Sequence, residues 1–233
     1  FGYVLLGLTL FLMGLEQAAN KSKERSREKG AVFVIFFIFV FQAMAKAKKA
    51  TFQSLQTEIR SGSFQPVYFF CGEEDFFIDQ LCTALEENVL PEAERSFNAH
   101  TLYGKDVDLP SLISMAKSFP MMAERQFILV KEAQDMAGLR RKGEQDLLVQ
   151  YLNQPMPSTV LAFAHKHGKP DKRKAWFKAI QKQATVFESD KIKDYKLEEF
   201  ITGFLKQKGL KANVQAVRLL SEHIGNDLSK LNN

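Results

Sequence analysis

The chain has 233 residues, of which 45% are apolar, so it can form one large or two small domains with a filled core. The first 50 residues carry the whole formal charge of +5, and the rest of the chain has equal numbers of basic and acidic side chains. Because Lys and Arg supply most of the non-specific affinity for phosphates, this neutral body argues against tight nucleic-acid binding by the chain alone.

Residues 1–43 differ in character from the rest. Two apolar runs, residues 1–15 and 31–41, flank a charged stretch, and both are shorter than the roughly 20 residues of a spanning helix. The first run also lacks the flanks of a secretory signal. A polar, Lys-rich stretch typical of a cytoplasmic protein begins at Met44. We therefore expect translation to begin at Met44 and residues 1–43 to be a non-native upstream segment. The alternative is a membrane-tethered adaptor.

From Met44 to residue 190, strand-like and helix-like patterns alternate. Short continuous apolar runs predict buried strands, and apolar residues at helical spacing predict helices. The expected strands are Val67–Cys71, Phe97–Tyr103, Phe127–Val130, Thr159–Ala164 and Thr185–Glu188, with helices at 75–89, 108–116, 147–152 and 171–180. This alternation predicts an α/β domain over residues 44–190, built on a mostly parallel sheet that helices cover.

From residue 191 onward the pattern is helical only. One helix has apolar residues at i, i+3, i+4, i+7 and i+8 from Leu197 and is closed by Gly209. A second helix follows over Val214–Ile224, closed by Gly225, and a third begins at residue 226 or 227. Residues 191–233 therefore predict a small all-helical lid domain that is truncated.

The turn after the first strand tests for nucleotide chemistry. A phosphate-binding loop needs glycines, a Lys and a Ser or Thr, whereas Gly72 is followed by three carboxylates, Glu73, Glu74 and Asp75. Lys131 follows the strand Phe127–Val130, where a Mg²⁺-binding Asp would be needed. We therefore expect no intrinsic catalysis and no cofactor.

Cysteine and histidine usage points the same way. Cys71 and Cys82 are too few for a disulfide framework and too far apart for a zinc site. His165 and His167 have no further ligand at suitable spacing. We expect buried thiols in a reducing compartment and no metal site.

The order of several blocks resembles one known family. Pro66–Leu81 (PVYFFCGEEDFFIDQL) is similar to the opening of bacterial DNA polymerase III delta subunits, in which a Gly-Glu turn replaces the phosphate loop. Phe97–Met136 resembles the next helix, the clamp-contacting element and the following strand of that family. Blocks at residues 157–166, 171–180, 186–189 and 221–231 match in the same order. The resemblance covers residues 50–231 and implies an AAA+-like fold with a lid, and on this resemblance we expect the family's C-terminal collar domain to be missing from the sequence.

The resemblance also implies a function. Members of this family work in DNA replication in the cytoplasm, without a membrane, as the clamp-loader subunit that binds and opens the sliding clamp (beta). The other loader subunits, gamma/tau and delta prime, are its partners, and primer–template DNA lies within the complex. The chain would then serve a DNA-directed DNA polymerase, a nucleotidyltransferase holoenzyme, without catalysis of its own. An active AAA+ ATPase is a less favoured alternative because the phosphate loop is missing.

The resemblance places the clamp-binding wedge at Met121 and Met122, with Phe119 and Pro120 beside them. Relatives often have Leu-Phe in place of Met-Met, but Met can also fill an apolar pocket. The residues alone would favour Phe119 and Met122 folding back onto the sheet, since apolar side chains are usually buried. The resemblance reverses this preference in favour of an exposed interaction site.

A basic stretch at residues 166–182 offers a second candidate surface. Lys172, Lys174 and Lys178 are possible DNA-facing residues, and Lys174 and Lys178 share one helix face. A solvated helix face with no partner is the alternative interpretation.

Overall fold

The computed structural model describes residues 50–225 and 227–232. The expectations about residues 1–43 and about a start at Met44 lie outside this range, and the predicted domain boundaries stay predictions. None of the helices within the described range is long and apolar enough to cross a membrane.

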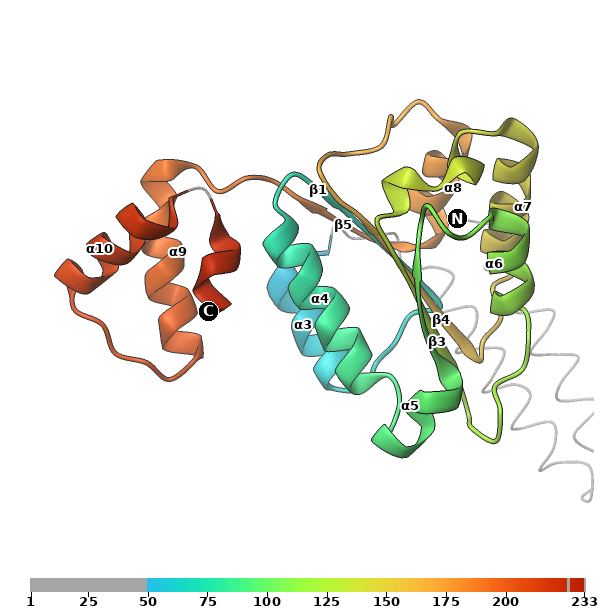
Figure 1. Cartoon of the computed structure of the whole chain (residues 1–233), viewed down its shortest axis with the longest axis horizontal. Coiled ribbons are helices and arrows are strands. Elements are labelled where there is room, and N and C mark those ends of the chain that lie inside the picture. The colour runs from blue at the N-terminus through green and yellow to red at the C-terminus, as the bar shows by residue number, and fades with distance from the viewer. Residues whose placement is uncertain (1–49, 226, 233) are drawn as a thin grey trace, which may run out of the picture. The chain divides into compact units, whose positions relative to one another are not determined.

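A parallel sheet of five strands forms the centre of the α/β part (Figure 1). The strand order is β2-β3-β4-β1-β5, and every neighbouring pair is parallel. The strands are β1 (Val67–Gly72), β2 (Ala99–Tyr103), β3 (Gln126–Lys131), β4 (Thr159–His165) and β5 (Thr185–Ser189). The continuous apolar runs of β1, β3 and β4 occupy the middle, because only strands covered on both faces are apolar throughout. The predicted α/β class is confirmed.

Helices cover both faces of the sheet (Figure 1). One face carries α3 (Phe52–Arg60) and α4 (Asp75–Asn88), and the other carries α6 (Leu109–Ala116), α7 (Lys142–Asn153) and α8 (Ala175–Gln183). Successive residues of β1 alternate between these two cores, as the pleat requires. Phe69 packs on the α8 side, with its ring 5.6 Å from that of Phe177, whereas Phe70 lies in the core beneath α3 and α4.

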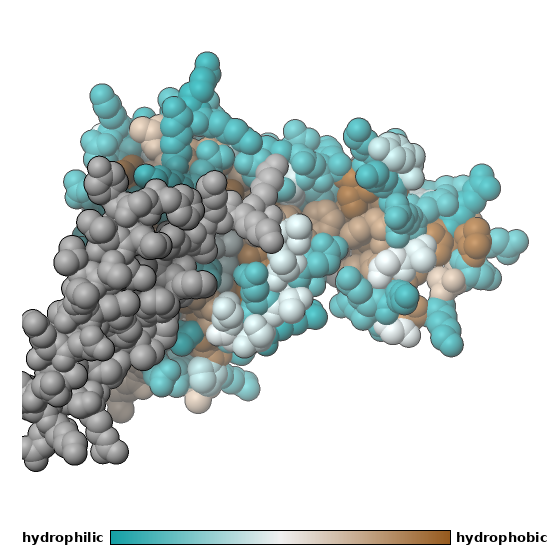
Figure 2. Space-filling view, turned by 180° about the vertical axis from the view of Figure 1, so that it is seen from behind, coloured by the Kyte–Doolittle hydropathy of each residue, from teal (hydrophilic) through white to brown (hydrophobic). Residues whose placement is uncertain are grey.

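The chain continues into a helical part after β5. It consists of α9 (Asp194–Gln207), α10 (Val214–Ile224) and a 3₁₀ turn at Leu228–Asn232, which stands where a third helix was expected. Phe76 of α4 is buried in the core of this helical part, with its ring 6.1 Å from that of Phe200. The space-filling view shows hydrophobic residues in separate small patches among hydrophilic ones on the face that is not grey (Figure 2).

Two short helices were missed by the sequence interpretation. Helix α3 begins at a reciprocal capping box between Thr51 and Ser54, a recognised start signal. Helix α5 (Glu92–Asn98) occupies the beginning of the expected strand Phe97–Tyr103, which shortens that strand to β2. Pro91 and the acidic residues that follow it are typical of a helix start, so this signal was also present in the sequence.

The start of α8 was also placed too early. Asp171 does not cap α8, because its carboxylate accepts hydrogen bonds from the backbone and side chain of Arg173 in the preceding turn. The helix begins only at Ala175. Two 3₁₀ turns, Ala133–Asp135 and Ala137–Leu139, connect β3 to α7.

Candidate functional site

The candidate site is the turn between α6 and β3, residues 117–125, which we call the apolar turn. Its large side chains point into solvent: Phe119 is 81% exposed, Met121 61% and Met122 100%. Pro120 stands in the middle, where its ring prevents a continued helix. The alternative in which Phe119 and Met122 fold back onto the sheet is therefore wrong.

Asn98, the last residue of α5, fixes the middle of the apolar turn. Its Oδ1 accepts a hydrogen bond from the backbone N–H of Met121 at 2.7 Å, and its Nδ2 donates to the carbonyl oxygen of Met121 at 3.0 Å. The Asn98 side chain is 2% exposed. The buried amide of Asn98 therefore forms hydrogen bonds with both backbone groups of Met121, whose own side chain is exposed.

Gln126 and Thr159 hold the start of the apolar turn. Gln126 Nε2 donates to the carbonyl oxygens of Met115 at 3.1 Å and Ser118 at 2.9 Å. The Thr159 hydroxyl donates to the carbonyl oxygen of Ala116 at 2.9 Å and accepts from Gln126 at 2.9 Å. Side chains of β3 and β4 thus satisfy carbonyl groups at the end of α6, which have no partner within a helix.

Met122 has a backbone conformation that residues other than glycine rarely adopt. Its φ of 51° lies in the left-handed region, where the β-carbon crowds the backbone. Strained residues of this kind persist only where the surroundings hold them, and they concentrate at functional sites. Met122 therefore combines the most exposed side chain of the apolar turn with an unfavourable backbone conformation.

The turn after β1 has a different construction from a phosphate-binding loop. The backbone N–H of Glu73 donates to the carbonyl oxygen of Ser189 at 3.1 Å, which joins the turn to the end of β5. Glu74 is the N-cap of α4, and its Oε1 accepts from the backbone N–H of Phe76 at 3.4 Å. A carboxylate thus occupies the helix N-terminus, where a phosphate would otherwise bind. Burial raises the pKa of Glu74.

A lysine stands at the end of β3, where a Mg²⁺-binding Asp would be needed for nucleotide hydrolysis. Lys131, the last residue of β3, lies 3.3 Å from the carboxylate of Glu86. Within residues 50–225 and 227–232, no cluster of three or more His, Cys, Asp or Glu side chains could hold a metal ion. We identify no set of residues suited to nucleotide hydrolysis in this part of the chain.

The three candidate DNA-facing lysines are not equivalent. Lys172 Nζ lies 3.0 Å from the carboxylate of Glu188, so much of its charge is neutralised. Lys174 and Lys178 form no ion pair with any residue that the structure describes. Both are exposed, and they flank the buried pair Trp176 and Phe177.

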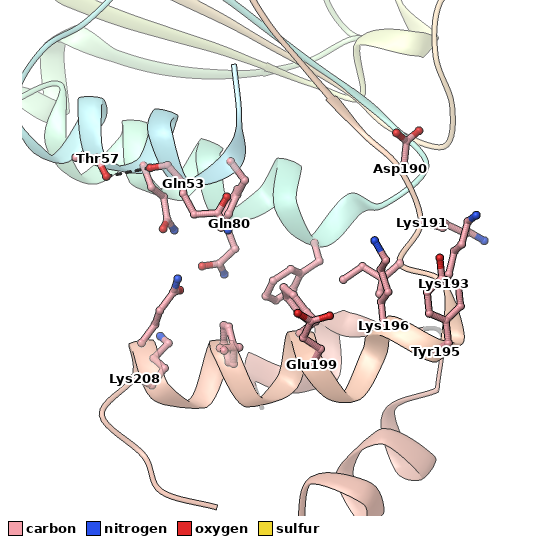
Figure 3. A pocket seen from close by; sticks show the side chains of 18 of the residues that line it. Gln53, Thr57, Gln80, Asp190, Lys191, Lys193, Tyr195, Lys196, Glu199 and Lys208 are labelled. Carbon is pink, nitrogen blue, oxygen red and sulfur yellow. Dashed lines mark hydrogen bonds between the residues drawn. The ribbon is translucent and has the colours of Figure 1, made fainter. Parts of the chain in front are cut away.

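A groove of about 870 Å³ lies between α3, α4 and α9 (Figure 3). Gln53 and Gln80 project into it from one wall, and Lys196 and Glu199 stand on the other. Its lining contains the cations Arg60, Lys191, Lys193, Lys196 and Lys208. None of the five has an ion-pair partner among the described side chains. The sequence interpretation missed this groove because segments far apart in the chain line it.

The chain resembles one family along more than half of its length. The family model for the DNA polymerase III delta subunit matches residues 68–190. A DNA polymerase III subunit delta from Bacillus subtilis (strain 168) is 25% identical over 174 residues, which cover 71% of this chain and 50% of that protein.

A solved structure, the Bacillus subtilis DNA clamp loader delta protein (YqeN), superposes with a TM-score of 0.63 at 23% identity. The match covers 73% of this chain and 52% of that structure. The chain thus spans about half the length of these two relatives.

Proposed function

Because the chain belongs to the DNA polymerase III delta subunit family, we propose that it acts in DNA replication by binding and opening a ring-shaped sliding clamp. The proposal includes assembly with the gamma/tau and delta prime subunits of a clamp loader in the cytoplasm. ATP would be hydrolysed by those partners, since the turn after β1 offers a carboxylate cap where a phosphate loop is needed.

The observation that carries this proposal is the exposure of three large apolar side chains on one supported turn. Phe119, Met121 and Met122 are largely exposed, whereas apolar residues of this size are ordinarily buried. Exposed apolar groups on a turn held by buried hydrogen bonds suit insertion into a hydrophobic pocket. The flexible Met side chains can adapt to the shape of such a pocket.

The test is calorimetric titration of the full chain with its cognate sliding clamp. We expect Met121→Ala/Met122→Ala to lower the affinity by about tenfold to a hundredfold, because buried apolar anchors dominate such interfaces. Leu219→Ala, a change of an equally exposed aliphatic residue on α10, is the matched control and should leave the affinity unchanged.

The outcomes separate the claims. Binding that survives the double substitution would move the site away from the apolar turn, and no binding by the folded wild-type chain would refute clamp binding. Tight ATP binding by the chain would favour the competing class, an active AAA+ ATPase.

We further propose that Lys174 and Lys178 face primer–template DNA. Of the three lysines Lys172, Lys174 and Lys178, Lys172 is the least suited to a DNA contact, because its ion pair with Glu188 neutralises much of its charge. The competing surface is the groove between α3, α4 and α9, whose cations Lys193 and Lys196 are free of ion pairs in the described range.

Fluorescence anisotropy of a labelled primer–template at several salt concentrations tests this DNA contact. Each phosphate contact contributes about 0.9 to the slope of log affinity against log salt, so Lys174→Ala/Lys178→Ala should reduce the slope by about two. A reduction seen only with Lys193→Ala/Lys196→Ala would assign DNA to the groove. If neither pair changes the slope, the positive charge of this part of the chain only keeps it solvated.

A further inference from the structure

The connection between α5 and the apolar turn joins residues 23 positions apart in the chain. Asn98 contributes both an acceptor and a donor to it, and both are paired with the backbone of Met121. We propose that Asn98 is a positioning residue that holds the apolar turn in the conformation that binds the clamp. This inference rests on the proposed function of the turn.

Asn98 acts through the backbone and not by touching a partner. Its side chain is 2% exposed, so an incoming protein cannot reach it without opening the fold. The exposed side chains are those of Met121, to whose backbone Asn98 is bonded, and of the next residue, Met122. A change at Asn98 therefore leaves every exposed apolar group in place. It weakens the attachment of the apolar turn, and it also removes the bond from Asn98 Nδ2 to the carbonyl oxygen of Glu94 within α5, at 3.3 Å.

The middle of the apolar turn needs such support because it has no regular secondary structure of its own. Residues 117–125 form neither a helix nor a strand. Met122 also occupies the left-handed region, which is unfavourable for a residue with a β-carbon. Without the two bonds to Met121, the turn would populate other conformations, and binding would have to select the competent one. Pre-organisation raises affinity by removing that ordering cost.

The chemistry of an amide is suited to this role. The Oδ1 of Asn98 accepts from the N–H of Met121, and its Nδ2, which carries two hydrogens, donates to the carbonyl oxygens of Met121 and Glu94. Aspartate at this position would keep the acceptor but lose the donor, and would bring a negative charge towards the carbonyl oxygen. Alanine would lose both bonds to Met121. Both substitutions thus weaken the attachment of the turn, one by repulsion and the other by truncation.

The experiment compares the full-length wild-type chain with Asn98→Asp and Asn98→Ala. We expect both substitutions to lower the affinity for the clamp, by about tenfold for Asn98→Ala, which loses both hydrogen bonds to Met121. Exchange of the Met121 amide hydrogen should accelerate in parallel, since its acceptor is Asn98. If Asn98→Ala does not fold, Asn98→Asp alone decides.

Asn213→Ala is the matched control. Asn213 also accepts a hydrogen bond from a backbone N–H, that of Ala216 at 2.8 Å, but it lies at the start of α10. It should destabilise the chain without altering clamp affinity or exchange at Met121. A purely structural role for Asn98 predicts the same result for Asn98→Ala, and that result would overturn the inference.

A double-substitution cycle provides a second readout. When Met121 and Met122 are already alanine, Asn98→Ala should lower the affinity much less than it does in the wild-type chain, because the anchors that it positions are gone. An equal loss in both backgrounds would overturn the inference. Failure of the wild-type chain to bind would refute the proposed function, and Met121 amide exchange would then still decide whether Asn98 fixes the turn.

Discussion

Gly72 and Ser189 approach each other so closely that a β-carbon at Gly72 would lie 2.0 Å from the carbonyl oxygen of Ser189. The two residues are paired at the ends of β1 and β5, and Gly72 has a φ of 148°. Its carbonyl oxygen also accepts a hydrogen bond from the N–H of Gly168 at 2.8 Å. The contact lies at the carboxyl ends of β1 and β5, and open α/β sheets commonly bind ligands at that end of their strands.

Gly72→Ala should therefore lower the free energy of unfolding by about 2 kcal/mol or more, because the backbone atoms of Ser189 cannot move aside cheaply. Urea denaturation followed by circular dichroism measures the change. Gly143→Ala in α7, where no atom lies within 4 Å of the added carbon, is the control and should raise the stability by about 0.5 kcal/mol. A neutral result for Gly72→Ala would mean that β1 and β5 separate readily.

The buried cap Glu74 should make stability depend on pH. Burial raises its pKa in the folded chain above the ordinary value of a glutamate, so the folded state binds this proton more tightly than the unfolded state. The contribution is therefore favourable at low pH and declines as the pH rises from about 4.5 through the folded pKa.

Glu74→Gln removes this titration and keeps an oxygen that can accept from Phe76. We expect the variant to be more stable than the wild-type chain at pH 7, with the difference shrinking as the pH falls below 4.5. Denaturation curves from pH 4 to pH 8 supply the comparison. A variant that is less stable at pH 7 would show that the charge of Glu74 at the start of α4 outweighs its burial.

Cys71 and Cys82 should not react in the folded chain. Both thiols are buried, and burial raises the pKa of each to about 12, so the reactive thiolate is scarce at pH 8. Incubation with iodoacetamide at pH 8 should leave both unmodified, as seen by mass spectrometry, whereas addition of guanidinium should expose both. Labelling of either thiol without denaturant would reveal local opening of β1 or α4.

The sequence predicted the central strands well because β1, β3 and β4 are apolar on both faces. This pattern is visible in the sequence even when the neighbouring strands and helices are unknown. Local start signals also existed for α3 and α5, but they were overlooked. The role of Asn98 is different in kind. Nothing near Asn98 in the sequence indicates that its amide pairs with Met121, because that pairing depends on tertiary packing.

The candidate site shows the same division. Pro120 indicated that the helix would end before the apolar residues, but apolar character alone favoured burial of Phe119 and Met122. Their exposure follows from how Asn98, Gln126 and the end of α6 are placed in three dimensions. Family resemblance pointed to the correct alternative for exposure, while the clamp contact itself stays a proposal.

Phe97 should extend the clamp-binding surface from the apolar turn onto α5. It is 64% exposed, and it directly precedes the residue whose side chain is bonded to Met121. Burial of about half of a Phe side chain on binding contributes on the order of 1 kcal/mol, so Phe97→Ala should weaken clamp binding about fivefold. Calorimetric titration against the clamp measures this loss.

Tyr195→Ala is the matched control, because Tyr195 is an equally prominent exposed aromatic residue on α9. It should leave clamp affinity unchanged, and neither substitution should alter the unfolding temperature by much, since both rings are solvated. Equal effects of Phe97→Ala and Tyr195→Ala would indicate non-specific adhesion. An unchanged affinity for Phe97→Ala would confine the contact to the apolar turn, and α5 would then serve the site only through Asn98.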